Sequence, residues 1–455
     1  MTDATAPMGA DVPKKARKSS LYGTDDRTKK RNAAEKRFQM YGIAAIGIGI
    51  FFLVILLVSI VRSGVPAFTQ TFIEVPVYLN EEVLDPNGNR DPDDLRRVST
   101  FGYAPLIDQA IFNQVQQTEG LTTTLEDASD MRKMVSASAP AILRDYVLAN
   151  PDEIGETVDF RILAASRVDG YMKDRVTRES VARDKNIDAA HLDLVDQLVE
   201  AGTIKREFNW DFITGADASE NRPEQAGIGV AMIGSFFMML VVLVLSLPIG
   251  VAASIYLEEF APKNRFTDLI EVNISNLAAV PSIVFGILGL AVFIQFAHLP
   301  QSAPLVGGLV LTLMTLPTII ISTRASLKAV PPSIRDAALG VGASKMQAVF
   351  HHVLPLAAPG ILTGTIIGLA QALGETAPLL LIGMVGYIAT NYPEGIASGF
   401  LDPNSSMPAQ IYEWSKRADP AYYERAWGGI IILLVFLLVM NVIAIILRRK
   451  FERRW

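Results

Sequence analysis

Six long apolar runs constrain this chain more than any other feature of its sequence. A helix needs about 20 apolar residues to cross the hydrocarbon core of a bilayer. Five runs meet that requirement: Tyr41–Val61, Ile228–Tyr256, Leu277–Phe296, Leu305–Ser322 and Trp427–Leu447. A sixth run, Ala357–Ile388, is longer than one span needs and contains the sequence GETAP at Gly374–Pro378. The sequence therefore predicts an all-α polytopic membrane protein with six transmembrane helices.

The first apolar run is expected to remain in the protein as an anchor helix over residues 41–63. Residues 1–40 precede it, and its length exceeds the roughly 7–15 apolar residues of a cleaved signal peptide. The residues before it form a basic tail with ten basic and five acidic side chains. We therefore treat 1–40 as a tail and 41–63 as the first span.

Basic residues near the span ends predict the orientation. Lys and Arg concentrate on the cytoplasmic side of membrane proteins. The tail 1–40 is basic, the final residues RRKFERRW are basic, and Arg324, Lys328, Arg335 and Lys345 surround the segment 334–355. Six crossings place both termini on one side. We therefore expect both termini and segment 334–355 to be cytoplasmic in a multi-pass protein of a bacterial inner membrane.

The segment 64–225, between the first two spans, is then extracytoplasmic. It holds 16 basic and 30 acidic residues, a local charge of −14. TFIEVPVYL (71–79) alternates as a strand does, whereas LEDASDMRKMV (125–135) and HLDLVDQLVEAG (191–202) have the pattern of amphipathic helices. LDPNGNRDPDD (84–94) is rich in turn residues. We expect a small α+β insert whose acidity mainly keeps its surface solvated.

Several kinds of chemistry are excluded by residues that the chain lacks. It has no cysteine, so disulfides and thiolate sites cannot form. No Gly-Lys pair occurs, which excludes a Walker A loop, and neither HExxH nor GxSxG is found. Its four histidines form no paired metal-ligand motif. We expect no catalytic site, no metal site and no bound cofactor, so that energy from ATP must come from another subunit.

The segment 334–355, IRDAALGVGASKMQAVFHHVLP, resembles the EAA motif of ABC-importer permeases. The matching residues are Asp336, Ala337, Ala338, Gly342, Leu354 and Pro355. Aspartate stands where that family usually has glutamate, but the spacing is the same. The resemblance implies a cytoplasmic coupling helix that contacts an ATPase subunit. Gly342 would permit a break between two short helices, and Pro355 is expected to end the second one before the next span. A helix bound to lipid headgroups is the alternative, but it does not explain the spacing.

Further stretches are similar to the PstA family of phosphate permease subunits. They are residues 227–262, 276–293 and GETAPLLLIG at 374–383. The resemblance covers about residues 226–447 and assigns nothing to the N-terminal 225 residues. It implies a type I ABC importer permease (MetI-like) core over 226–455. It also implies a PstC-like second permease, two PstB-like ATPases that hold ATP and Mg, and a PstS-like binding protein outside. Membrane lipid is expected as a partner, and nucleic acid is not.

The interruption at GETAP is the candidate for the translocation path or its gate. Glu375 is an ionisable group within an apolar run, which is costly and usually faces a cavity or a partner. Pro378 has no N–H, so the Gly374 carbonyl loses its helical donor. These groups, with the Thr376 hydroxyl, form a candidate site of the kind that transporters build at broken helices. Alternatively, Glu375 only repairs its own helix break. Ser282, after Pro281, could open a half-helix that faces an anion, or could mark a simple kink.

Three other functions remain open at this stage. The chain could transport another oxyanion, such as phosphonate, sulfate or molybdate, although GETAPLL favours phosphate. It could be a secondary transporter, but then the coupling segment would have no purpose. It could also be a membrane sensor or assembly protein that works through its external domain. We expect a transmembrane permease subunit that forms half of the path of an ATP-driven phosphate importer.

Overall fold

The computed structural model describes residues 26–118, 120–384 and 392–451 of the 455-residue chain. The chain divides into two compact parts, Met1–Ser59 and Ile60–Trp455. Three predictions fall partly outside the described residues. They concern the first 25 residues of the basic tail, the end of the apolar run 357–388, and the last four residues of the basic C-terminus.

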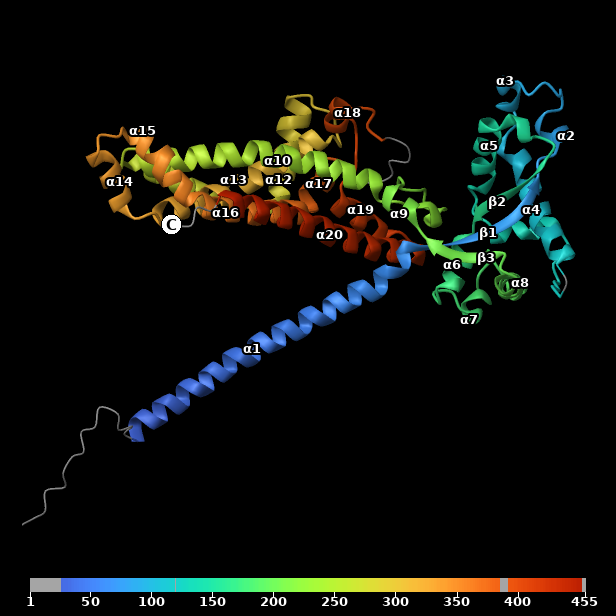
Figure 1. The fold of residues 1–455 in the computed structure, drawn as a ribbon, viewed down its shortest axis with the longest axis horizontal. Coiled ribbons are helices and arrows are strands. Elements are labelled where there is room, and N and C mark those ends of the chain that lie inside the picture. Colours follow the sequence, from blue (N-terminus) through green and yellow to red (C-terminus); the bar gives the residue numbers. More distant parts are fainter. Residues whose placement is uncertain (1–25, 119, 385–391, 452–455) are drawn as a thin grey trace, which may run out of the picture. The chain divides into compact units, whose positions relative to one another are not determined.

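The first apolar run forms α1 (Asp26–Gly64), an uninterrupted helix of 39 residues (Figure 1). Charged residues fill its first turns, and the run YGIAAIGIGIFFLVILLVSIV follows. A run of this length and composition is sufficient to cross a bilayer as a helix. This agrees with the predicted first span.

Segment 64–225, here called the insert, contains a three-stranded antiparallel sheet in its described residues. β1 (Thr69–Tyr78) lies between β2 (Thr157–Leu163) and β3 (Ile204–Phe208). In the register of the sheet, Val75 pairs with Phe160 and Ile73 pairs with Ile204. Alternate residues of β1, from Ile73 to Val77, are buried, which fits a strand with one face on a core. The strand predicted at 71–79 is confirmed.

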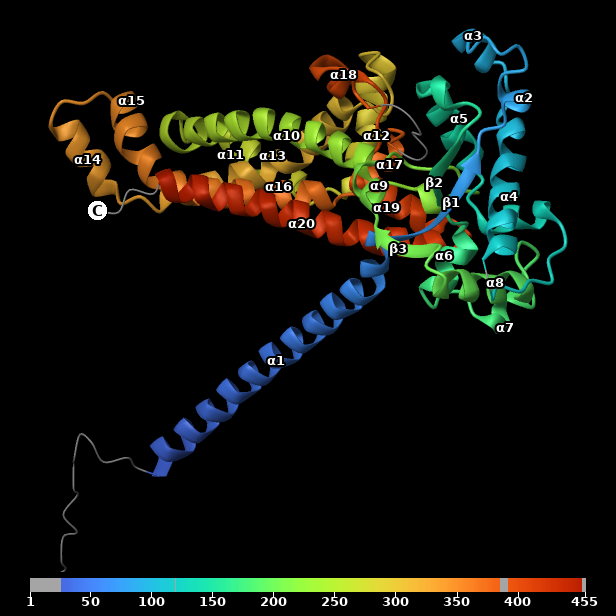
Figure 2. The same cartoon turned by 45° about the vertical axis from the view of Figure 1, so that its right-hand side comes forward.

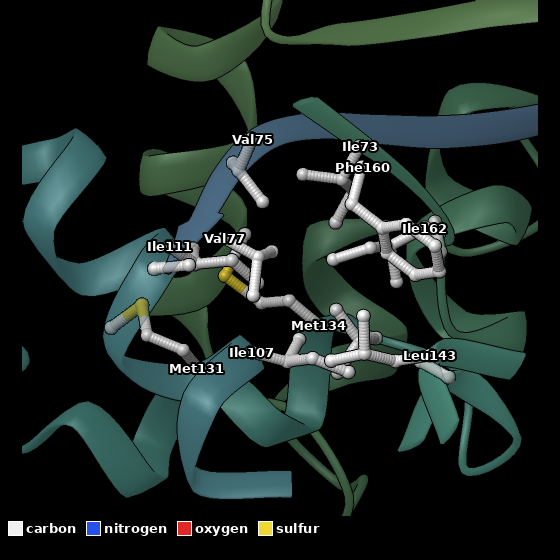
Figure 3. Packing of buried hydrophobic residues seen from close by; sticks show 14 of the residues in the cluster. Ile73, Val75, Val77, Ile107, Ile111, Met131, Met134, Leu143, Phe160 and Ile162 are labelled. Atoms are coloured by element: carbon white, nitrogen blue, oxygen red, sulfur yellow. The ribbon is translucent and has the colours of Figure 1, made fainter. Parts of the chain in front are cut away.

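The described residues of the insert also form eight α-helices. They are α2 (Glu81–Leu84), α3 (Pro92–Leu95), α4 (Thr100–Gln117), α5 (Ala139–Ala149), α6 (Ser166–Met172), α7 (Arg178–Val181), α8 (Ala189–Glu200) and α9 (Trp210–Thr214). Of these, α4 and α6 contact β1, and α8 contacts β3. Figure 3 shows Ile107 and Ile111 of α4 and Leu143 of α5 packed with the β1 side chains in one core. The predicted helix at 191–202 corresponds to α8, whereas 125–135 forms a 3₁₀ helix, Ala128–Met134, instead of an amphipathic α-helix.

The remaining apolar runs form a helical bundle. Its long helices are α10 (Gly229–Ile255), α11 (Arg265–Leu277), α12 (Ser282–Gly289), α13 (Pro304–Lys328), α16 (Leu354–Gly374) and α20 (Pro420–Phe451). π-helical turns extend α10 to Phe260 and α12 to Phe296. Among the described residues, five helices including α1 are long and apolar enough to span a membrane. The bent pair α11–α12, with an angle of 101° between its members, gives a sixth if it is one span.

Small residues allow the central helices to pack closely. A Cβ atom added to Gly308 of α13 would lie 2.5 Å from Val241 Cβ of α10. One added to Gly364 of α16 would lie 2.0 Å from the Ser322 hydroxyl of α13. Glycine at such positions is typical of membrane helices, which associate by close packing more than by a hydrophobic effect. The helix α13 therefore forms the centre of the bundle, with α10 and α16 on its sides.

Five further helices in the described residues are short. They are α14 (Pro332–Gly340), α15 (Lys345–Ala348), α17 (Ala377–Leu381), α18 (Ile396–Leu401) and α19 (Met407–Lys416). Figures 1 and 2 both show α14 and α15 at one end and the sheet at the other. The helix α20 begins near the sheet and runs toward α14 and α15. The structure thus agrees with the predicted class, an all-α membrane protein with a small α+β insert.

Candidate functional site

The predicted coupling segment forms a sharp bend between two short helices. Helix α14 ends in a Schellman motif, in which Ala343 N donates to Ala338 O and Gly342 N donates to Leu339 O. Gly342 has φ = 89°, a left-handed conformation that glycine adopts without steric penalty. The break predicted at Gly342 is therefore present, and its cause is the backbone conformation of that one residue.

The second half of the segment differs from the prediction at Pro355. Ser344 and Gln347 cap α15 reciprocally, and a π-helical turn, Val349–Val353, joins α15 directly to α16. The helix is thus continuous from Lys345 to Gly374, so the expectation that Pro355 ends it is wrong. Pro355 is the second residue after the π turn, where the hydrogen-bond pattern changes from i→i+5 to i→i+4. We attribute the presence of Pro355 inside a continuous helix to this change of hydrogen-bond pattern, which accommodates a residue without an N–H.

Much of the segment's surface is exposed. Asp336, Ala337 and Gly342 are exposed, Leu354 and Pro355 are half-buried, and Ala338 is buried. Apolar side chains beside them are also open to solvent, including Val341, which is 86% exposed. Exposed apolar groups beside exposed polar ones are typical of a surface that a partner covers.

Ion pairs that sequence analysis missed hold this segment against the bundle. Arg335 binds the Glu259 carboxylate through two nitrogens, at 2.7 and 3.0 Å, and also donates to the Val330 and Leu327 carbonyls. Arg335 stands directly before the acidic residue of the motif. The sequence YLEEF after the second apolar run, in which Glu259 follows Glu258, is the signal that could have indicated these partners.

Arg324 of α13 makes a second clamp nearby. Its guanidinium lies 3.4 Å from Glu258 and 2.6 Å from Glu271 of α11, and Lys328 lies 3.5 Å from Glu258. These contacts tie the ends of α10, α11 and α13 together. The basic residues that predicted a cytoplasmic location therefore also act as internal ion-pair partners.

The predicted interruption in the run 357–388 is present. Helix α16 ends at Gly374, Glu375 has an extended backbone with ψ = 128°, and α17 begins at Ala377. Glu375 and Thr376 are half-buried, whereas Pro378 is buried. Within the described residues the Glu375 carboxylate has no hydrogen bond or ion pair. The alternative that this side chain repairs its own helix break therefore has no supporting contact.

Helix α12 lies beside this interruption. A Cβ atom added to Gly286 would lie 2.7 Å from Pro378 Cα, and one added to Gly289 would lie 3.2 Å from Ile382. From Gly286 to Gly289 along α12, the neighbouring residue changes from Pro378 to Ile382, which is later in the chain. The helices α12 and α17 therefore run parallel. The start of α12 at Ser282, with Pro281 as its N-cap, therefore lies on the same side as the break at Gly374–Thr376.

Helix α16 runs antiparallel to α13 on its way to the interruption, where Gly374 itself is exposed. Gly360 of α16 lies beside Ser326 of α13, and Gly368 lies beside Ile319. This antiparallel register places the Gly374 break next to the first half of α13. The structure thus gathers Gly374, Glu375, Thr376, Pro378 and Ser282 in one region, and the coupling residues in another.

A buried charged cluster, which sequence analysis also missed, joins the insert to the last membrane helix. The Lys173 ammonium lies 2.7 Å from Asp169 and 2.8 Å from Glu424 of α20, and its side chain is only 2% exposed. Glu424 also pairs with Arg175. Arg425 donates to the Ala67 carbonyl at 3.0 Å. The adjacent charges Glu424 and Arg425, at the start of an apolar run, were the available signal.

Other polar contacts strengthen the same junction. Arg417 pairs with Asp217 at 2.6 Å, and Trp414 donates to that carboxylate at 2.7 Å. Glu224 accepts a hydrogen bond from Ser136, but its burial raises the pKa of its carboxyl group. Most of these charges have partners, as buried charges usually do. The insert and the start of α20 are therefore one structural unit.

Two family models match the chain. Residues 25–182 match a domain of unknown function, DUF3333, and residues 246–455 match the binding-protein-dependent transport system inner membrane component. The second range contains the bundle from the end of α10 onward, including both the coupling segment and the interruption.

Curated relatives match the same half of the chain. The chain is 30% identical over 226 residues to a probable ABC transporter permease protein, YqgI, of Bacillus subtilis. The match covers 48% of this chain and 76% of the relative. The chain is also 30% identical over 235 residues to the phosphate transport system permease protein PstA of Mycobacterium leprae, covering 51% and 74%. For PstA of Haemophilus influenzae the identity is 30% over 234 residues, covering 51% and 78%.

Proposed function

The chain belongs to the family of binding-protein-dependent transport system inner membrane components, and from this premise we propose that it imports inorganic phosphate. It is a multi-pass permease subunit of an ABC importer. The observation that carries the choice of phosphate is the 30% identity to two PstA proteins over the permease half. GETAPLLLIG at 374–383, which forms the helix break, lies within that half.

The proposed mechanism needs no ATPase site on this chain. ATP and Mg belong to two PstB-like partner subunits, and the chain itself performs no covalent chemistry. A soluble binding protein, PstS-like in this proposal, delivers phosphate from outside. A PstC-like second permease supplies the other half of the path. ATP hydrolysis then shifts the populations of inward-facing and outward-facing states.

We assign the coupling role to the exposed bend around Gly342. Asp336, Ala337 and the Schellman turn are open to a partner, and the Arg335–Glu259 pair fixes the first helix to α10. A force applied to α14 therefore reaches α10 through a charge-assisted contact as well as through the chain. This arrangement supports transmission of a movement from an ATPase to the bundle.

The interruption at Gly374–Thr376 is our candidate for gating or phosphate contact. Glu375 is a half-buried carboxylate without a partner in the described residues, which fits a group that pairs with another subunit in one state of the cycle. Ser282 and the start of α12 lie on the same side. A bare carboxylate would repel phosphate, so pairing with a cation of the second permease is the role that we favour.

The proposed orientation puts both termini and the coupling segment in the cytoplasm. The basic residues around 334–355 and in the tail support it. The acidic insert is then on the outer side of a bacterial inner membrane. Helix α14 and the sheet lie at opposite ends of the bundle, as this orientation requires (Figure 2).

The decisive experiment is transport by the assembled complex. The chain should be purified with the subunits that accompany it, and those subunits should be identified by mass spectrometry. The complex should then be reconstituted in proteoliposomes, with the phosphate-binding protein supplied outside the vesicles and omitted inside them. We expect ATP-dependent uptake of radioactive phosphate. Sulfate, molybdate and a phosphonate serve as competitors. If one of these anions competes more strongly than unlabelled phosphate does, that anion is the substrate. If no ATP-driven uptake occurs, the result favours a sensor or assembly role.

A further inference from the structure

The loop between α2 and α3 carries oxygen-bearing side chains at alternate positions. Its sequence is DPNGNRDPDD, with Asp85, Asn87, Asn89, Asp91 and Asp93 spaced by two. Calcium loops of the EF-hand kind also present ligands at positions 1, 3, 5, 7 and 9. The loop lies in the insert, outside the permease half, and the proposed function uses none of these residues.

The backbone of the loop already curls around these side chains. The Asp85 carboxylate accepts a hydrogen bond from Arg90 N at 2.7 Å through Oδ2. Arg90, the sixth residue of the pattern, has φ = 52°. That is the position at which EF-hand loops have an invariant glycine for a sharp turn. The chain thus bends back toward its first aspartate where a calcium loop does.

A second carboxylate faces two amides across the loop. Asp94 Oδ2 accepts from Asn89 Nδ2 at 2.9 Å and from Asn87 Nδ2 at 3.3 Å. Rotation of an asparagine amide by 180° exchanges its nitrogen and oxygen without moving the backbone. Both amides can therefore present oxygen to a cation next to Asp94.

An independent observation points to a missing ligand. Asp85 is only 3% exposed, and its second oxygen, Oδ1, is buried without a hydrogen-bond partner in the part of the chain that the structure describes. The carboxyl group is turned into the loop, because its other oxygen binds Arg90 N. A buried carboxylate oxygen without a partner is costly and uncommon. A cation bound at Oδ1 would remove that cost.

The ends of the loop are fixed in the core. Leu84 before it and Leu95 after it are fully buried. Arg90 reaches across to the Asp152 and Ile154 carbonyls, at 3.2 Å each. The loop is therefore held at three points. This lowers the conformational-entropy cost of ordering the ligands when a cation binds.

We propose that this loop is a calcium site, with Asp85, Asn87, Asn89 and Asp94 as its side-chain ligands. Within the described residues no three His, Cys, Asp or Glu side chains gather as a metal site. The proposed donors are two carboxylates and two amides, and calcium accepts amide and carbonyl oxygens as readily as carboxylates. All the donors are oxygen, which disfavours zinc, and flexible asparagines do not impose the strict octahedron that magnesium requires.

The affinity should be that of an extracellular module. Two carboxylates give a low ligand charge, so we expect a dissociation constant on the order of 10⁻⁴ to 10⁻³ M. Binding would stabilise the insert, because the folded loop holds the cation and the unfolded chain does not.

The test uses the full chain purified in a detergent without anionic lipid. After treatment with EGTA and its removal, equilibrium dialysis against ⁴⁵Ca²⁺ should reveal one saturable site, and calcium should raise the thermal unfolding midpoint more than equal magnesium does. Asp85→Asn and the double variant Asn87→Ala/Asn89→Ala should lose both effects. Asp145→Asn, which removes an exposed carboxylate elsewhere in the insert, should keep them.

The double variant protects the test against misfolding at the buried Asp85. Its two asparagines are exposed, so circular dichroism should show a folded chain that nevertheless fails to bind calcium. Equal calcium uptake by the wild type and this folded variant would overturn the proposal. Equal stabilisation by magnesium and calcium would overturn it as well, because it would indicate a general effect of divalent charge.

Discussion

Two glycines in the coupling segment have the same surroundings but different backbone conformations. A Cβ atom at either Gly340 or Gly342 would meet nothing within 4 Å. Gly342 is left-handed at φ = 89°, whereas Gly340 is the last residue of α14 and is helical. The need for glycine at 342 is therefore conformational and not steric.

We predict that Gly342→Ala impairs coupling and that Gly340→Ala does not. Alanine in a left-handed conformation costs about 1–2 kcal/mol, which is roughly a tenfold shift toward other turn geometries. The same methyl group at Gly340 favours the helix slightly. Transport-stimulated ATP hydrolysis by the reconstituted complex measures the difference. Equal hydrolysis by both variants at wild-type level would remove the coupling role of the turn.

The Glu375 carboxylate offers a second test at a single residue. We predict that Glu375→Gln lowers phosphate uptake strongly while the complex still assembles, because glutamine keeps size and hydrogen bonding but carries no charge. Glu394→Gln, at an exposed position, is the matched control. Uptake by cells lacking other phosphate systems is measured with subunit levels checked by blot. Near-normal uptake by the first variant contradicts a gating role for the charge.

The start of α20 is an element whose stability depends on the insert. Glu424 binds Lys173 and Arg175, both contributed by the segment after α6. Removing one partner of a buried ion pair leaves an uncompensated charge. Deletion of residues 64–225 would therefore also remove the cations that pair with Glu424 in the permease half.

We predict that Glu424→Gln destabilises the chain by about 3–5 kcal/mol, the usual cost of breaking a buried pair. Glu413→Gln breaks the pair with Lys416, whose side chain is 49% exposed, and solvent screening leaves such a surface pair with little effect on stability. Thermal unfolding in detergent compares the two variants. Similar unfolding midpoints would mean that solvent reaches the junction and that the insert is only loosely attached.

Elements governed by local backbone chemistry could be predicted from the sequence. Pro378 lacks an N–H and Gly342 tolerates a left-handed φ, so both breaks follow from single residues and their neighbours. Pro355 shows the limit of that reasoning. The same missing N–H was expected to end a helix, but a π turn before it, Val349–Val353, lets the helix continue.

Contacts between distant segments could not be predicted. Lys173 and Glu424 are 251 residues apart, and Arg335 and Glu259 are 76 apart. Each residue alone is consistent with a solvated surface charge, and only the fold shows that the members of each pair meet, with Lys173 and Glu424 buried and Arg335 partly buried. The roles that we propose for Glu375 and Ser282 likewise involve other subunits, and this sequence alone does not specify those contacts.

At the scale of the whole molecule, the proposed topology places the two ends of the bundle on opposite sides of the membrane. The bundle has the bend of α14 and α15 at one end and the sheet at the other, and the chain has no cysteine. Single cysteines therefore report the two ends without background labelling. Ser129 in the insert and Ser333 in α14 are both exposed, so both sites should react once a reagent reaches them.

We predict that Ser129→Cys reacts with a membrane-impermeant maleimide in intact cells whose outer barrier has been removed. Ser333→Cys should react only after lysis, because the positive-inside rule places Arg324, Lys328 and Arg335 in the cytoplasm. Phosphate uptake by both variants confirms that the labelled chains are folded and assembled. The opposite labelling pattern would invert the topology, and it would place the bend of α14 and α15 where no ATPase could reach it.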